Sequence, residues 1–303
     1  MEIDVPLVLA RWVHFLCLMI VFGASLFPFY ALRAGAKGES LRALAVTERR
    51  IGLCAYLALV SAVAWVASSL ATMVGGFDEI LDRDALAAFF FETSFGPIWL
   101  LRLAILLALV FVIAWSPRPR TALCACLSGA ALASQAWLGH AAMRTGSELV
   151  VELLSYMAHV LAAGAWIGGL LPLASLLVSR GSRPGDAHAS ECREALLRFS
   201  NVGILLVSLI LLSGLANSVF RLKFLSDLFA TPYGFVILAK ASLFGLMLIA
   251  AAVNRWRLVP RLECDGKEEA ALLALRGNIL IEQGLAVLVL GLAAILGTLA
   301  PRA

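Results

Sequence analysis

The sequence predicts an all-α, polytopic membrane protein with eight transmembrane helices. Hydrophobic residues make up 62% of the 303 residues and charged residues only 15%, whereas soluble domains carry about 25% charged residues. The apolar residues are gathered into runs of about 20 or more, which is the length that crosses a bilayer as a helix. None of these runs has the alternation typical of an outer-membrane barrel strand. The composition therefore excludes both a soluble domain and a β-barrel.

Eight apolar runs follow one another along the chain, and each is long enough to satisfy its own backbone hydrogen bonds in lipid. They cover residues 5–32, 51–74, 97–115, 121–140, 149–178, 200–219, 233–253 and 277–299. Because no basic segment precedes the first long run, we expect a retained helix there rather than a signal peptide. Four connecting segments mix charges with apolar residues at helical spacing, and we expect short amphipathic helices in the interface. These segments are 39–50, 78–91, 187–198 and 261–276.

Lys and Arg residues are distributed unevenly among the connections. Sixteen lie after the first, third, fifth and seventh runs, whereas five lie in the other connections and the C-terminal tail. By the positive-inside rule the first group is cytoplasmic, so both termini are predicted to be periplasmic. The basic residues form no patch of their own, and nucleic acid is therefore not an expected partner.

Matching landmarks predict two four-helix repeats, residues 1–145 and 146–303, that together form one membrane domain. His14 and His159 are each followed nine residues later by a glycine. Because each half has an even number of spans, the two repeats would run the same way, and the two histidines would lie at equivalent depths. The stretch 163–169 also places glycines four residues apart, a pattern that favours tight helix packing.

Three of the four histidines, His14, His140 and His159, fall in predicted spans at a similar depth in the outer half of the bilayer. Ionisable residues in lipid normally face the bundle interior and mark a functional path, although an imidazole can also simply hydrogen-bond a neighbouring helix. Imidazole binds copper, zinc or iron, and sulfur ligands bias a site toward Cu(I). Cys17 and Met143 each follow a histidine by three residues and share its helical face. These five residues are the predicted metal ligands.

Further residues in or near the spans are candidates for the transport path or for contacts to the metal ligands. They are Trp12, Arg11, Trp166, Asn217, Lys240 and Glu282. Arg102 and Lys240 each lie six residues after the glycine that opens their helix. The expectation for Arg11, Arg102 and Lys240 is that they snorkel to the interface, or else that they pair with an acidic or anionic group. Glu282 is expected in an inner relay or in a polar contact with Asn254.

Several stretches along almost the whole chain carry a family resemblance. They are Arg11-Trp12-Val13-His14, Gly139-His140-Ala141, 159–170, Arg198-Phe199-Ser200, 213–217 and 233–255. Their order and spacing resemble the CopD family of copper-resistance membrane proteins. The resemblance implies an inner-membrane protein that handles copper ions delivered from the periplasm, often with a small CopC-like copper-binding partner. It also implies that His14, His140 and His159 correspond to the membrane histidines of the family.

Three functions remain open at this point. In the leading one, which is not enzymatic, copper is held by the imidazoles near the outer face and passes inward between the two repeats. In the second, histidines on facing helices hold a b-type haem for electron transfer, and Arg102 with Lys240 neutralises its propionates. In the third, the chain is a membrane docking partner of a periplasmic copper carrier. Copper binding, a visible spectrum and partner binding without the histidines distinguish the three.

Overall fold

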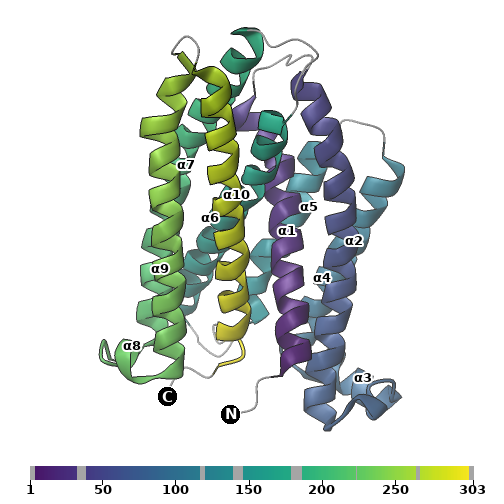
Figure 1. Cartoon of the computed structure of the whole chain (residues 1–303). Coiled ribbons are helices and arrows are strands. Elements are labelled where there is room, and N and C mark those ends of the chain that lie inside the picture. Colours follow the sequence, from purple (N-terminus) through teal and green to yellow (C-terminus); the bar gives the residue numbers. More distant parts are fainter. Residues whose placement is uncertain are drawn as a thin grey trace.

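The computed structural model describes residues 4–32, 39–116, 120–138, 146–178, 186–222, 224–263 and 267–299. These residues form helices and no strands. Eight of the helices are long and apolar enough to cross a membrane, which confirms the predicted fold class (Figure 1).

The spanning helices divide evenly between the two halves of the chain. The first half contributes α1 (Val5–Ala31), α2 (Glu39–Val74), α4 (Gly96–Trp115) and α5 (Thr121–Ala133), which continues as a 3-10 helix over Ser134–Leu138. The second half contributes α6 (Ser147–Val178), α7 (Asp186–Arg221), α9 (Pro232–Val253) and α10 (Glu268–Leu296). A π-helix (Asn254–Leu258) and a 3-10 helix (Val259–Glu263) follow α9. Helix α1 begins, and α10 ends, at the same end of the bundle (Figure 1).

Short helices fill two of the connections at that same end. Between α2 and α4 the chain forms a 3-10 helix (Phe77–Glu79), α3 (Arg83–Ala87) and a π-helix (Ala88–Glu92). Between α7 and α9 it forms α8 (Asp227–Ala230). Figure 1 shows α3 and α8 at the end where α1 begins. The prediction of helical structure in 78–91 is therefore confirmed.

The prediction of separate amphipathic helices in the other three connections is wrong. Segment 39–50 is the first part of α2, and 187–198 lies within α7, each in unbroken helix. No proline interrupts either junction, and an existing helix extends with little further cost, so the polar turns continue the span. The described part of segment 261–276 is divided between the 3-10 helix after α9 and the first turns of α10.

Helices α4 and α9 begin with the same local structure. The Thr93 hydroxyl accepts a hydrogen bond from the Gly96 amide at 3.1 Å, and the Thr231 hydroxyl accepts one from the Gly234 amide at 3.0 Å. A Cβ at either glycine would overlap backbone of the preceding short helix. Threonine thus caps an amide that has no partner within the helix, and glycine permits the close approach. These starts fix the rotation of α4 and α9.

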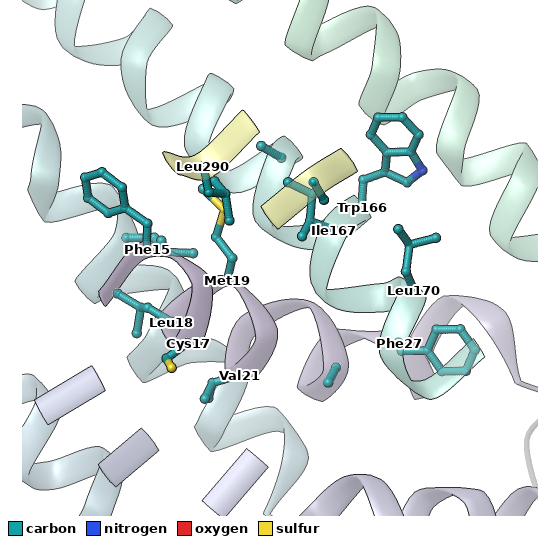
Figure 2. Packing of buried hydrophobic residues seen from close by; sticks show 14 of the residues in the cluster. Phe15, Cys17, Leu18, Met19, Val21, Phe27, Trp166, Ile167, Leu170 and Leu290 are labelled. Carbon is teal, nitrogen blue, oxygen red and sulfur yellow. The ribbon is translucent and has the colours of Figure 1, made fainter. Parts of the chain in front are cut away.

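The two halves meet where α1 crosses α6. A Cβ on Gly23 would lie 2.6 Å from the Gly168 Cα and would overlap the Gly164 carbonyl. In the reciprocal direction, a Cβ on Gly168 would lie 2.8 Å from the Gly23 Cα and would overlap the Met19 carbonyl. The predicted small-residue face of α6 is therefore packed against a matching face of α1. Figure 2 shows the apolar side chains of α1, α6 and α10 that surround this crossing.

The outside of the bundle is apolar, as a lipid-facing surface requires. Large hydrophobic side chains are exposed along the outer faces of the spanning helices, including Leu211, Leu212 and Leu215 on α7. In water such a continuous apolar surface would be an interaction site. On eight spanning helices it is the surface that contacts acyl chains.

Candidate functional site

His14 lies in the core of the first half and has no exposed surface. Its Nδ1 lies 2.9 Å from the Ala58 carbonyl oxygen on α2, so Nδ1 carries the proton and donates it. Its Nε2 lies 2.9 Å from an Arg102 guanidinium nitrogen on α4. A guanidinium only donates hydrogen bonds, so Nε2 is the acceptor. The lone pair that a metal ion would use is therefore held by Arg102.

Arg102 is itself fully buried. Its second terminal nitrogen donates to the Ala131 carbonyl at 2.7 Å and to the Ser134 hydroxyl at 2.8 Å, where α5 passes into its 3-10 extension. Its guanidinium carbon lies 5.2 Å from the centroid of the Trp99 ring. The expectation that Arg102 snorkels to the interface is wrong, because the core offers its guanidinium more hydrogen-bond acceptors than a simple apolar span would.

Aromatic rings enclose this polar cluster. The Trp65 ring packs edge-on against His14 with 5.7 Å between ring centroids, and against Trp99 with 5.1 Å. Arg11 covers Trp65, with its guanidinium carbon 4.6 Å from the ring centroid. Cations over tryptophan are attracted by the ring quadrupole, more so where water is excluded. Trp65 and Trp99 thus pack around the buried His14 and Arg102 side chains.

His159 occupies a similar setting in the second half. Its Nδ1 lies 3.2 Å from the Ile210 carbonyl oxygen and 3.1 Å from the Ser213 hydroxyl, both on α7. Lys240 on α9 is close enough to interact with the imidazole electrostatically. Within the described part of the chain no residue forms a hydrogen bond to Nε2 of His159. This nitrogen is therefore the available ligand atom, in contrast to Nε2 of His14.

The two histidines share one pattern of contacts. Each Nδ1 faces a carbonyl oxygen and a serine hydroxyl three residues later on the following long helix: Ala58 and Ser61 for His14, and Ile210 and Ser213 for His159. Each imidazole also has a cation from the third spanning helix of its own half nearby. The four-helix repeat, which stays a prediction from the sequence, would account for this shared pattern. The two rings make these contacts within different halves of the bundle.

Other predicted residues lie around the two clusters. The Trp12 indole donates to the Val287 carbonyl on α10 at 2.9 Å and so ties α1 to the second half. Trp166 is buried on α6 and packs edge-on against Phe244. Asn217 lies one turn beyond the serine that faces His159 and is half-buried.

Of the other predicted metal ligands, the structure describes Cys17 but not His140 or Met143. Cys17 is buried on α1 as a free thiol, one turn from His14. His140 and Met143 lie outside the described residues, and their predicted ligand roles stay predictions. Over the described ranges, no group of three or more His, Cys, Asp or Glu residues is placed to hold a metal ion.

A second polar cluster lies in the predicted cytoplasmic half. Asn254 donates to the Glu282 carboxyl at 2.5 Å, which is one of the two arrangements expected for Glu282. Asn278, which the sequence reasoning missed, donates to the Asn254 side chain and to the Ala250 carbonyl, each at 2.8 Å. Its position four residues before Glu282 on the same helix was the available signal. Glu282 and Asn254 line a cavity of about 390 Å³ between α6, α7, α9 and α10.

Taken together, fold and site define a polytopic membrane protein with one buried imidazole, His14, and one half-buried imidazole, His159, each in a polar cluster. Residues 1–151 match the family model "Copper resistance protein D-like, N-terminal domain", and residues 193–296 match "Copper resistance protein D". The chain is 34% identical to Copper resistance protein D of Pseudomonas syringae pv. tomato, over 98% of this chain and 97% of that protein. No solved structure matches the chain.

Two more distant relatives extend the comparison. Inner membrane protein YebZ of Escherichia coli is 29% identical over 96% of this chain and 97% of that protein. Copper transport protein CutJ of Bacillus subtilis is 30% identical over 72% of this chain and 41% of that protein. The chain belongs to the copper resistance protein D family, as its stretches predicted, and it is a multi-pass inner-membrane protein.

Proposed function

We propose that this protein transports copper across the inner membrane, taking it from the periplasmic side at imidazole ligands in the outer half of the bilayer. Family membership supports copper as the cargo, since two relatives carry copper resistance or copper transport in their names. Transport rather than catalysis fits a chain made almost wholly of spanning helices. Copper is here the substrate that passes through, not a resident cofactor.

One observation supports the histidine site above the others. His14 and His159 both turn Nδ1 toward a backbone carbonyl, which leaves Nε2 as the nitrogen that a metal ion would bind. Histidines that bind metals almost always donate their second ring N–H to a carbonyl or carboxylate, because this fixes the tautomer and the ring orientation. An imidazole that only cross-linked helices would not need the same nitrogen bound in both halves.

The two histidines differ in whether Nε2 is free to bind a copper ion. Nε2 of His159 has no hydrogen-bond donor among the described residues, whereas Nε2 of His14 accepts from Arg102. We infer that copper binds His159 first and reaches His14 only when Arg102 turns away. Arg102 also occupies the position that haem iron would need at His14, so the haem alternative has no support from this geometry.

The remaining predicted residues are proposed as further parts of the copper transport path. His140 and Met143 are proposed as further ligands at the outer end of α5, and Cys17 follows His14 one turn further along α1. The cavity beside Glu282 lies at the other end of the second half and is proposed as the inner part of the path. A periplasmic copper carrier of the CopC type is the proposed donor.

Copper titration of the detergent-purified protein tests the histidine site. Because removal of a ligand leaves copper with weaker partners, we expect His159→Ala to weaken copper affinity by about 10-fold to 100-fold. The double variant His14→Ala/His159→Ala is expected to lose that copper equivalent altogether. Binding is measured by competition with a chromophoric chelator and by metal analysis after gel filtration.

His188→Ala is the matched control, because residue 188 lies in the first turns of α7, before the spanning part of that helix begins. It should bind copper as the unmodified protein does. If the double variant keeps the stoichiometry and affinity of the unmodified protein, the histidine site is wrong. A visible spectrum of the same sample with a stoichiometric Soret band would favour the haem hypothesis over copper transport.

A further inference from the structure

Two cysteine thiols from different helices lie together beside the His14 cluster. Cys17 on α1 is buried, Cys54 on α2 is half-buried, and both are free thiols. The two thiols are close enough to interact with each other. The sequence pattern relates Cys17 to His14 and indicates no role for Cys54.

The helix geometry accounts for this pairing independently. Helices α1 and α2 are joined by the contact between His14 and the Ala58 carbonyl, and they run in opposite directions. Cys17 lies three residues after His14, and Cys54 lies four residues before Ala58. Both are therefore about one turn from that contact and on the same side of it. Figure 2 shows the Cys17 sulfur on the face of α1 opposite Met19, away from α10.

We propose that Cys17 and Cys54 together form a two-coordinate Cu(I) site, one turn inward of His14. The proposal rests on copper being the cargo. Soft thiolate ligands select Cu(I), a closed-shell ion that accepts two ligands in a linear arrangement. Two thiols from facing helices supply that arrangement without a third residue. The site would take copper from His14 and hold it deeper in the first half.

The binding step needs no oxidant or reductant. One Cu⁺ ion replaces the two thiol protons, two Cu–S bonds form, two protons are released, and the complex carries one negative charge. Arg50, one turn before Cys54 on α2, is close enough to the Cys54 thiol to interact with it electrostatically. The positive charge of Arg50 would offset the negative charge of the Cu(I) complex. A buried pair of thiols without a cation nearby would not have this compensation.

Packing alone is a weaker explanation of the pair. A buried cysteine usually behaves as a small apolar residue, and Cys124 on α5 fits that description because it is buried with no described sulfur partner. It therefore serves as a matched control. Cys17 and Cys54 differ from it because each sulfur faces another sulfur across a helix interface.

The test uses the full-length protein in detergent under anaerobic, reducing conditions, with Cu(I) as the probe and a chromophoric Cu(I) chelator as competitor. We expect Cys17→Ser and Cys54→Ser each to weaken Cu(I) binding at this site by at least tenfold, and Cys124→Ser to leave it unchanged. X-ray absorption at the copper edge reports the ligands directly. In the unmodified protein loaded with Cu(I) we expect sulfur neighbours that are lost in the Cys17→Ser variant.

Each result decides one of the two proposals. If both single serine variants bind Cu(I) like the unmodified protein, or if its spectrum shows no sulfur neighbours, the thiol site is overturned. The histidine site then still stands or falls by its own variants. If the serine variants lose Cu(I) at this site while His14→Ala/His159→Ala keeps it there, the thiol site stands on its own, and the histidine site is decided by the total copper stoichiometry of its own double variant. Gel-filtration profiles and melting temperatures establish that each variant is folded.

Discussion

Replacing Gly168 by alanine is expected to lower the free energy of unfolding by about 3 kcal/mol, the upper range for an overpacked core. The added Cβ would overlap the Met19 carbonyl and lie 2.8 Å from the Gly23 Cα. Both neighbours are backbone, which no change of rotamer can move aside. Helices α1 and α6 must therefore separate along the crossing that joins the two halves. The melting temperature of the detergent-purified protein measures the effect.

Gly284→Ala on α10 is the control, since a Cβ there meets nothing within 4 Å. It should leave the melting temperature unchanged or raise it slightly, because alanine favours helix. Gly23→Ala should reproduce the loss seen for Gly168→Ala, and the double variant should lose less than the sum, since both act on one contact. A Gly168→Ala protein that melts like the unmodified one would show that the crossing is not tightly packed.

Replacing Arg102 by methionine is expected to increase copper binding at His14 by at least tenfold. Nε2 of His14 accepts from Arg102 in the present structure, and methionine has no donor to hold that lone pair. The measurement is a copper titration in the Cys17→Ser background, so that the imidazole sites titrate without the proposed thiol pair. The new binding must depend on His14.

Arg102→Lys and His14→Ala/Arg102→Met serve as controls for this result. Lysine keeps a positive donor and should give a smaller gain than methionine, although it lacks the fork of the guanidinium. Combining Arg102→Met with His14→Ala should abolish the gain. Unchanged affinity in the methionine variant, or a gain that survives the loss of His14, contradicts the role of Arg102 as the group that closes this site.

The sequence by itself determined the number of spanning helices, the family and the small-residue face around Gly168. The spans follow from local composition, because a helix in lipid must satisfy its backbone hydrogen bonds within its own segment. The family follows from the order and spacing of short stretches along the chain. The contact of Asn254 with Glu282 is one of the two arrangements that the sequence predicted, since a buried carboxyl needs a polar partner. The orientation, the repeat and the ligand roles of His140 and Met143 stay predictions from the sequence.

Only the tertiary structure decided which atoms of the candidate site are available. Helical spacing gives the depth of a residue, but the rotation of each helix against its neighbours decides whether a long cation such as Arg102 reaches the interface or a buried imidazole. The same holds for the pairing of Cys17 with Cys54, which are far apart in sequence. The carbonyl oxygens that orient His14 and His159 belong to other helices, and no sequence pattern marks a backbone oxygen as an acceptor.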